Sequence, residues 1–496
     1  MLTAAKGGGI IFAGNVFQYA SRFFIGILLA RLLGAEEFGL YNLAMTAAAV
    51  AAGLALLGLR PALVRYVSLH ASRRDSAGLW GTLQIGLGLP ALLSVLMGVG
   101  LYALASPIAE RLFSEPRLVP LLRMVSLVVP FLALSGLIAA ATRGFNKMQY
   151  TVIAQNISQP LIRLVLLLIL AIIGLNAVLA LTSFGLTIAV VFAMLLFFLH
   201  KLFPLNRPFG MARRDTREML SFSLPIYMVS LIKTFRGSIQ TLLLGALHTV
   251  ATVGVFTVAT QVNMIGKMFH DSVVTASMPI VSELYGKQAW RQMGHYYQTV
   301  TKWTFAVNLP MSLIIVLFST PILSIFGRDY VGGATALILL ASASLVNAST
   351  GICGVVIDMS GNTTLKLVNS VVVVLFSLGL SILLIPPWGM VGAAVAALAA
   401  AIVVNLMRLV EVFFLFRLLP YNQDFFKPIL AGFVALLVAW GIRQSFATET
   451  NLFYTLINMI LLLAIYAGVI LALGLSQEDR VVLSRLSQRM RAVLSK

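Results

Sequence analysis

Apolar runs of about 20 residues follow one another along almost the whole chain, separated by short polar breaks. A helix of about 20 residues is long enough to cross the hydrocarbon core of a bilayer. The 496 residues are 60% hydrophobic and only 10% charged, so the polar surface is too small to cover a water-soluble globule. The sequence therefore predicts an all-α integral membrane protein.

Charged, Gly, Pro and Asn clusters divide the apolar runs into about 14 expected transmembrane helices. An even number places both termini on one side of the membrane. The expected segments are 8–33, 39–68, 79–105, 119–142, 151–173, 177–200, 219–245, 252–282, 295–318, 332–357, 365–385, 391–416, 427–445 and 453–473.

The basic residues are distributed unevenly between the two sides of this topology. The termini and the even-to-odd loops hold about 21 of the 35 Lys and Arg residues, against about 6 in the opposite loops. By the positive-inside rule, both termini are expected on the cytoplasmic side of an inner membrane. The tail from Ser476, with Glu478 and Asp479 in its first turn, is predicted to be an amphipathic helix on the cytoplasmic face.

An internal repeat divides the chain. The segment G-L-Y-N-L-A at Gly39 returns as G-V-F-T-V-A at Gly254, 215 residues later, and the same spacing relates Gly174 to Gly389. Gly144 and Gly361 lie at a similar offset. We expect an N-terminal lobe (1–200), a cytoplasmic loop (201–218), a C-terminal lobe (219–417), two extra helices (427–473) and a tail (474–496), an organisation typical of transporters.

Several motifs carry a family resemblance that extends over the whole chain. The opening AGNVFQYASRFFIGILLARLLGAEEFGLYNLA, with its R-x-L-G-x-x-x-F-G-x-Y core, is the most specific of them, followed by GLRPALVRYVS, RGFNKMQY and GVVIDMSGNTTLKL. They resemble the polysaccharide-transport branch of the multidrug, oligosaccharidyl-lipid and polysaccharide exporter superfamily. The resemblance implies a V-shaped pair of six-helix lobes and the flipping of undecaprenyl-pyrophosphate-linked oligosaccharide, with polysaccharide assembly proteins as further partners.

Charges inside the expected spans are overwhelmingly basic. Each costs roughly 2.5 to 3.5 kcal/mol at the centre of a transmembrane helix, so most should face water, a partner or an anionic cargo. Arg22 and Arg236 fall within one residue of equivalent repeat positions, which predicts one guanidinium from each lobe for the forked recognition of phosphate. The predicted substrate-binding residues are Arg22, Arg60, Arg163, Lys233, Arg236 and Lys267.

Other polar residues leave alternatives open. Arg31, Arg65, Lys302 and Arg408 are interpreted as side chains that snorkel to the interface. Lys267 and Asp271 lie at i and i+4, either as a structural ion pair or, through Asp271 and the shallower Asp358, as an ion-coupling site. Six amide residues either line the cavity or join helices, namely Asn15, Gln18, Asn156, Gln261, Asn263 and Asn369.

Missing motifs argue against other classes. The sequence has no Walker A motif for ATP, no metal-ligand spacing among its five histidines, one cysteine (Cys353) and no aromatic-basic groove for nucleic acid. We therefore expect no metal, cofactor or catalytic residues, and a transporter rather than an enzyme. A lipid II flippase is the nearest alternative. A membrane-embedded polymerase or glycosyltransferase needs larger extramembrane parts, and a cation-drug antiporter needs an acidic cavity.

Overall fold

The computed structural model describes residues 2–206, 208–445, 452–474, 476 and 478–480, without the side chains of residues 2–13, Asn15, Phe209, Thr363, 443–445 and Leu452. Helices form nearly all of this part, and no strand occurs in it. The all-α prediction is confirmed. The longer helices are α1 (Leu2–Ala55), α2 (Leu59–Ser72), α3 (Ser76–Ala103), α5 (Leu118–Gly144), α7 (Gln159–Ile173), α8 (Ala177–Leu202), α9 (Thr216–Leu247), α10 (Val250–Gly286), α11 (Trp290–Ser324), α12 (Ala334–Ser349), α14 (Thr363–Phe416), α15 (Phe426–Ser445) and α16 (Leu452–Ala472).

Many helices in the described ranges have the length and the apolar composition needed to cross a membrane. Nine of their helices are long and apolar enough to cross a membrane, or ten if the bent pair Val16–Ala55 and Leu59–Ser72 counts as one span. The polar helices α9 and α10, which carry several of the predicted bases, are not among the nine. When α1 and α14 are divided at their kinks, a helical segment occupies each of the expected spans.

Two glycines make the kinks that fold the longest helices. Gly34 has φ 73° inside α1 and Gly389 has φ 53° inside α14, a left-handed backbone conformation that glycine adopts without a Cβ penalty. Gly174, the predicted repeat equivalent of Gly389, also has positive φ, between α7 and α8. Both halves of the repeat therefore turn the chain at a glycine in this position.

The repeated glycines Gly39 and Gly254 lie where α1 crosses the start of α10. A Cβ on Gly39 would come closer than 3.0 Å to the Val250 carbonyl oxygen, and one on Gly254 would do the same to the Ala35 carbonyl oxygen. Val250 and Ala35 are themselves 215 residues apart, so the contact is reciprocal. The two copies of the repeated motif thus pack backbone against backbone, which explains why each needs glycine.

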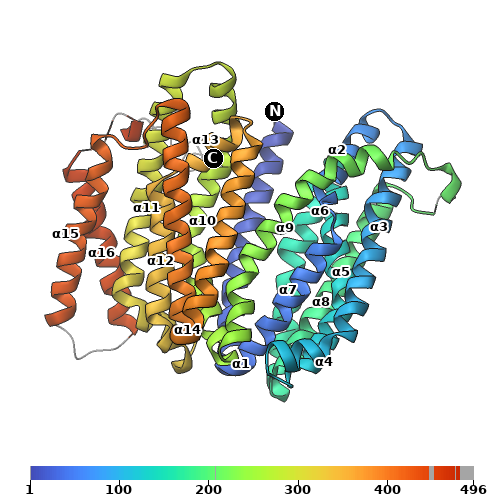
Figure 1. Ribbon diagram of the computed structural model, residues 1–496, viewed down its shortest axis with the longest axis horizontal. Coiled ribbons are helices and arrows are strands. Elements are labelled where there is room, and N and C mark those ends of the chain that lie inside the picture. The colour runs from blue at the N-terminus through green and yellow to red at the C-terminus, as the bar shows by residue number, and fades with distance from the viewer. Residues whose placement is uncertain (1, 207, 446–451, 475, 477, 481–496) are drawn as a thin grey trace, which may run out of the picture. The chain divides into compact units, whose positions relative to one another are not determined.

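The described chain forms two compact units. Unit 1 comprises Met1–Val258 with Ile385–Met390, and unit 2 comprises Ala259–Leu384 with Val391–Lys496. In unit 1, α5 packs against α1, α2, α3 and α8, and α9 packs on α1 and α2 (Figure 1). In unit 2, α11 packs against α12, α15 and α16.

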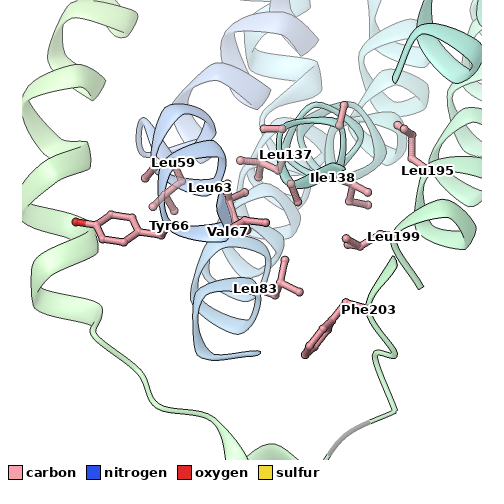
Figure 2. Close-up of a cluster of buried hydrophobic side chains, with 14 of the residues drawn as sticks. Leu59, Leu63, Tyr66, Val67, Leu83, Leu137, Ile138, Leu195, Leu199 and Phe203 are labelled. Carbon is pink, nitrogen blue, oxygen red and sulfur yellow. The ribbon is translucent and has the colours of Figure 1, made fainter. Parts of the chain in front are cut away.

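In unit 1, a cluster of buried apolar side chains joins α2, α3, α5 and α8 (Figure 2). Leu59, Leu63 and Val67 recur along one face of α2 and meet Leu137 and Ile138 of α5. The two helices run parallel, because Arg60 lies beside Gly136 and Val67 lies beside Gly144. This register decides which polar side chains of α2 and α5 meet.

Candidate functional site

Arg22 and Arg163 form one basic locus in unit 1, between α1 and α7. Arg22 lies on α1 and Arg163 on α7, and α1 packs against both α7 and the π-helical segment that precedes it. Arg163 donates from Nη2 to the Tyr41 hydroxyl, and its guanidinium lies 5.7 Å from the Tyr41 ring centroid and 5.1 Å from that of Phe184. Its Nε is buried without a hydrogen-bond partner in the described structure. The locus therefore keeps unused donors and charge.

A π-helical segment precedes α7 at this locus. Residues Val152–Ser158 (η2) open the helix, and π-bulges of this kind leave backbone groups available to side chains. Gln18 of α1 donates to the Gln155 carbonyl oxygen at 3.3 Å, and Gln155 donates to the Ser135 carbonyl oxygen of α5 at 3.4 Å. The Ser135 hydroxyl is buried without a partner. Polar groups therefore surround the locus on three helices.

Arg60 belongs to a second basic locus, which sequence reasoning recognised only in part. Its guanidinium lies against Gly136 of α5, where a Cβ would come 2.7 Å from the Arg60 Cζ. Arg143, in the last turn of α5, donates from Nε to the Ala139 carbonyl oxygen at 3.3 Å, so its guanidinium extends along α5 toward Gly136 and Arg60. Arg143 lies in the RGFNKMQY motif but near a helix end, so depth alone does not single it out.

The remaining predicted bases are distributed over α9 and α10. Lys233 and Arg236 have exposed side chains on α9 in unit 1, and their spacing of three residues places them on one face. Lys267 is exposed on the part of α10 that belongs to unit 2. Five of the six predicted bases thus lie in unit 1, in the two loci and on α9. Their role in anion binding stays a prediction.

The predicted ion-coupling carboxylates have different surroundings in unit 2. Asp358 forms an ion pair with Lys366 at 2.9 Å, near the start of α14. Asp271 is exposed on α10, and among the described residues no ion pair joins it to Lys267. The structural-ion-pair interpretation therefore lacks support, and ion coupling through Asp271 stays a prediction.

Several amides join helices. Asn263 accepts a hydrogen bond from Ser344 at 3.1 Å, and Asn369 donates to Glu411 at 2.7 Å. Asn156 is buried, and the Gln261 Oε1 is buried without a partner. The side chain of Asn15 lies outside the described residues. Hydrogen bonds thus join Gln18 and Asn263 to neighbouring helices, and Asn369 joins the two halves of the kinked helix α14.

The interpretation of Lys302 as a snorkelling side chain is wrong. Lys302 is buried in α11, and its Nζ donates to Asp479 at 2.8 and 2.9 Å and to the Ser476 hydroxyl at 2.7 Å. Trp303 Nε1 also donates to Asp479, at 2.7 Å. The predicted cap at Ser476 is present and holds the start of the tail against α11. Residues 481–496 of the predicted tail helix lie outside the described part.

Comparisons with known proteins give these loci a context. The chain matches the polysaccharide biosynthesis protein family over residues 4–285, more than half its length, and the MatE family over residues 225–391. A probable low-salt glycan biosynthesis flippase of Haloferax volcanii, Agl15, is 25% identical over 184 residues. This match covers 37% of the chain and 39% of that relative.

Solved structures share the fold across most of the chain. The lipid II flippase MurJ in an inward closed conformation has a TM-score of 0.75 at 16% identity, covering 92% of this chain and 97% of MurJ. An inward-facing MATE-family transporter has a TM-score of 0.66 at 18% identity, covering 79% and 93%. Identities this low show the fold alone. Together with the family match, the fold establishes that the chain belongs to the polysaccharide biosynthesis protein family of the MOP exporter superfamily.

Proposed function

We propose that the protein is a flippase for undecaprenyl-pyrophosphate-linked oligosaccharide, such as an O-antigen, capsule or exopolysaccharide repeat unit. It carries this cargo from the cytoplasmic to the outer leaflet of the inner membrane by alternating access of two lobes, residues 1–200 and 219–417, with both termini in the cytoplasm. Family membership and the name of the Haloferax volcanii relative support a lipid-linked glycan as cargo.

The observation that carries the proposal is the Arg22–Arg163 locus. Two like charges at neighbouring positions within transmembrane helices oppose folding unless an anion or water compensates them. Arg22 forms no ion pair with any of the described residues. A guanidinium binds phosphate oxygens through a forked pair of donors, so a pyrophosphate linkage matches the charge and the donors of this locus.

The polar groups beside the locus suit the rest of such a cargo. Gln18, Gln155 and the free hydroxyl of Ser135 offer neutral donors and acceptors next to the guanidinium pair. Sugar hydroxyls form hydrogen bonds with groups of this kind. The arrangement supports an anionic linkage held by arginine and an oligosaccharide held by amides.

Translocation of lipid-linked oligosaccharide in reconstituted vesicles tests the proposal. Arg22→Ala and Arg236→Ala should each lower the flipping rate by roughly tenfold or more, because each removes a charge-assisted contact worth about 1.5 to 3 kcal/mol. Arg→Lys at either position should restore only part of the rate, since the ammonium lacks the fork. Arg73→Ala, in an exposed loop, is the control and should keep the full rate.

The outcome also distinguishes the nearest alternatives. If Arg22→Ala and Arg236→Ala both insert into the membrane normally and keep the full flipping rate, these arginines do not bind the anionic linkage. Transport of lipid II but not of oligosaccharide would replace the proposed cargo by the peptidoglycan precursor. Synthesis or transfer of sugar by the purified protein, without translocation, would favour the polymerase or glycosyltransferase alternative.

A further inference from the structure

The pair formed by Arg60 and Arg143 has no acidic partner to explain it. Arg60 lies in the first turn of α2 and Arg143 in the last turn of α5. Both side chains are exposed, and neither forms an ion pair with any of the described residues. Two guanidinium groups are therefore held near each other on parallel helices without a fixed counter-charge.

The geometry of α5 brings the two guanidinium groups together. Gly136 and Arg143 are seven residues apart, which places them on the same face of the helix two turns from each other. Helical side chains lean toward the N-terminus, and Arg143 does so here, because its Nε donates to the Ala139 carbonyl oxygen at 3.3 Å. The Arg143 guanidinium thus extends toward the guanidinium of Arg60 over Gly136.

Gly136 is the feature that makes this a built site. The position would place a Cβ 2.7 Å from the Arg60 Cζ and 2.8 Å from its Nε, so any larger residue would displace the guanidinium. Leu137 and Ile138, the next residues of α5, pack into the apolar cluster with Leu59 and Leu63 of α2 (Figure 2). This packing fixes the register that holds Arg60 over the glycine.

The helix dipoles account for only one of the two bases. A cation in the last turn of a helix is favoured, which suffices to explain Arg143. A cation in the first turn is disfavoured, so Arg60 sits against the dipole of α2 as well as against Arg143. An anion placed between the two guanidinium groups would offset their mutual repulsion and the unfavourable interaction of Arg60 with the α2 dipole.

We propose that Arg60 and Arg143, seated on Gly136, form a pyrophosphate site separate from the Arg22–Arg163 locus, which holds the linkage of the lipid-linked cargo as it enters the protein. This inference rests on the proposed function and adds a second binding site for the cargo, referred to below as the second station. Arg143 lies beside the end of α2 that leads into the basic loop of Arg73 and Arg74, which the charge rule predicts to be cytoplasmic, and Arg60 lies about three helical turns farther from that loop. The cargo would meet this station before the deeper one.

Chemical protection of single arginines tests the site in the full-length protein. Phenylglyoxal modifies accessible guanidinium groups, and peptide mass spectrometry reads each residue separately. The probes are inorganic pyrophosphate and farnesyl pyrophosphate, with farnesol as the uncharged control, in phosphatidylcholine nanodiscs. At ten times the half-saturating concentration, modification of Arg60 and Arg143 should slow roughly tenfold, since about a tenth of the sites remain free.

Matched positions on the same helices serve as controls. Arg123, an exposed base near the opposite end of α5, should be modified at the same rate with and without pyrophosphate. Gly136→Ala changes no charge but displaces the Arg60 guanidinium, so protection of Arg60 and Arg143 should need at least about tenfold more probe. Gly88→Ala in α3, where a Cβ meets no atom within 4 Å, should leave protection unchanged.

The expected result is joint protection of Arg60 and Arg143 with one half-saturation point, lost in Gly136→Ala. Unchanged modification rates, protection at two different concentrations, or full protection in Gly136→Ala would each overturn the site. Protection by phosphatidylglycerol added to the nanodiscs, equal to that by farnesyl pyrophosphate, would assign the site to a lipid headgroup and overturn the cargo assignment.

The proposed function can fail separately. If the protection pattern holds but the wild-type protein moves no lipid-linked oligosaccharide, the site stands and the flippase assignment is wrong. If flipping depends on Arg22 while Arg60 and Arg143 show no protection, the flippase assignment stands and the second station is wrong.

Discussion

Lys302 of unit 2 and Arg60 of unit 1 are both cations within transmembrane helices, but their partners differ completely. Lys302 is buried and receives Asp479 and the Ser476 hydroxyl from the tail. The Arg60 guanidinium lies against Gly136, and the side chain of a second cation, Arg143, extends along α5 toward it. The first arrangement is buried and paired within the chain, whereas the second is exposed and has no ion pair among the described residues.

The contrast suggests two roles for a basic side chain in a transmembrane helix: holding helices together and binding an anionic cargo. A base that holds helices together acquires a fixed acid, because an uncompensated buried charge would cost several kcal/mol. A base that binds a travelling anion must remain without such an acid, since a permanent counter-charge would compete with the cargo. We therefore expect a binding base to be recognised by the lack of a paired acid rather than by burial alone.

Removing the acid from the satisfied pair should have the largest effect on stability. Asp479→Asn leaves Lys302 buried without its counter-charge, so the free energy of unfolding should fall by about 3 kcal/mol, measured by SDS-driven unfolding in mixed micelles. Glu478→Gln is the matched control. It removes the neighbouring acid, which pairs with an exposed His295 at 3.2 Å, and should cost less than about 1 kcal/mol.

The same measurement on unit 1 completes the comparison. Arg60→Gln removes a charge that has no acidic partner, so unfolding should become no easier. A loss in Arg60→Gln as large as that in Asp479→Asn would show that Arg60 is also a structural cation. Equal losses in Asp479→Asn and Glu478→Gln would show that the Lys302 pair is unimportant.

An acid placed beside Arg60 should give this base a fixed counter-charge, as Asp479 does for Lys302. Val64 lies one helical turn beyond Arg60 on α2, so Val64→Glu places a carboxylate at i+4 from the guanidinium. The acid should compete with the cargo and slow flipping by roughly tenfold, about 1.4 kcal/mol. Val64→Gln, of similar size but neutral, should slow it much less. Equal rates for the two variants would remove charge competition as the cause.

The smallest expected effect is a pH dependence of the tail contact. Burial raises the pKa of Asp479, but the hydrogen bonds from Lys302 and Trp303 and the charge of Lys302 outweigh it and hold the pKa below its ordinary value. A depressed pKa contributes stability above the ordinary value, about pH 4, and this contribution is lost as the pH falls through the folded-state pKa.

The stability difference between wild type and Asp479→Asn should therefore be full near neutral pH. It should shrink only below about pH 4, in thermal unfolding scans at a series of pH values. A difference that shrinks already between neutral pH and pH 5 would contradict the depressed pKa. The comparison would then lose its electrostatic basis, although the hydrogen bonds to Asp479 would remain.

Local sequence properties determined the fold class, the positions of the helices and the repeat. Hydropathy and length act on one segment at a time, so apolar runs of spanning length predict helices wherever they occur. The repeat was equally readable, because the close crossing at Gly39 and Gly254 requires the same residue type in both copies. The sequence also singled out the bases within the expected spans, because the cost of a charge there depends on its depth.

Only the tertiary structure decided which charges meet. Lys302 and Asp479 are 177 residues apart, and the interval includes helices whose packing no local pattern specifies. Arg143 joins Arg60 because α2 and α5 run parallel with Gly136 beside Arg60, a register set by apolar packing rather than by either arginine. The depth of a residue in a span is a property of one helix, so the sequence can identify candidate bases. Their partners depend on how several helices pack, so only the structure shows which bases are paired with acids.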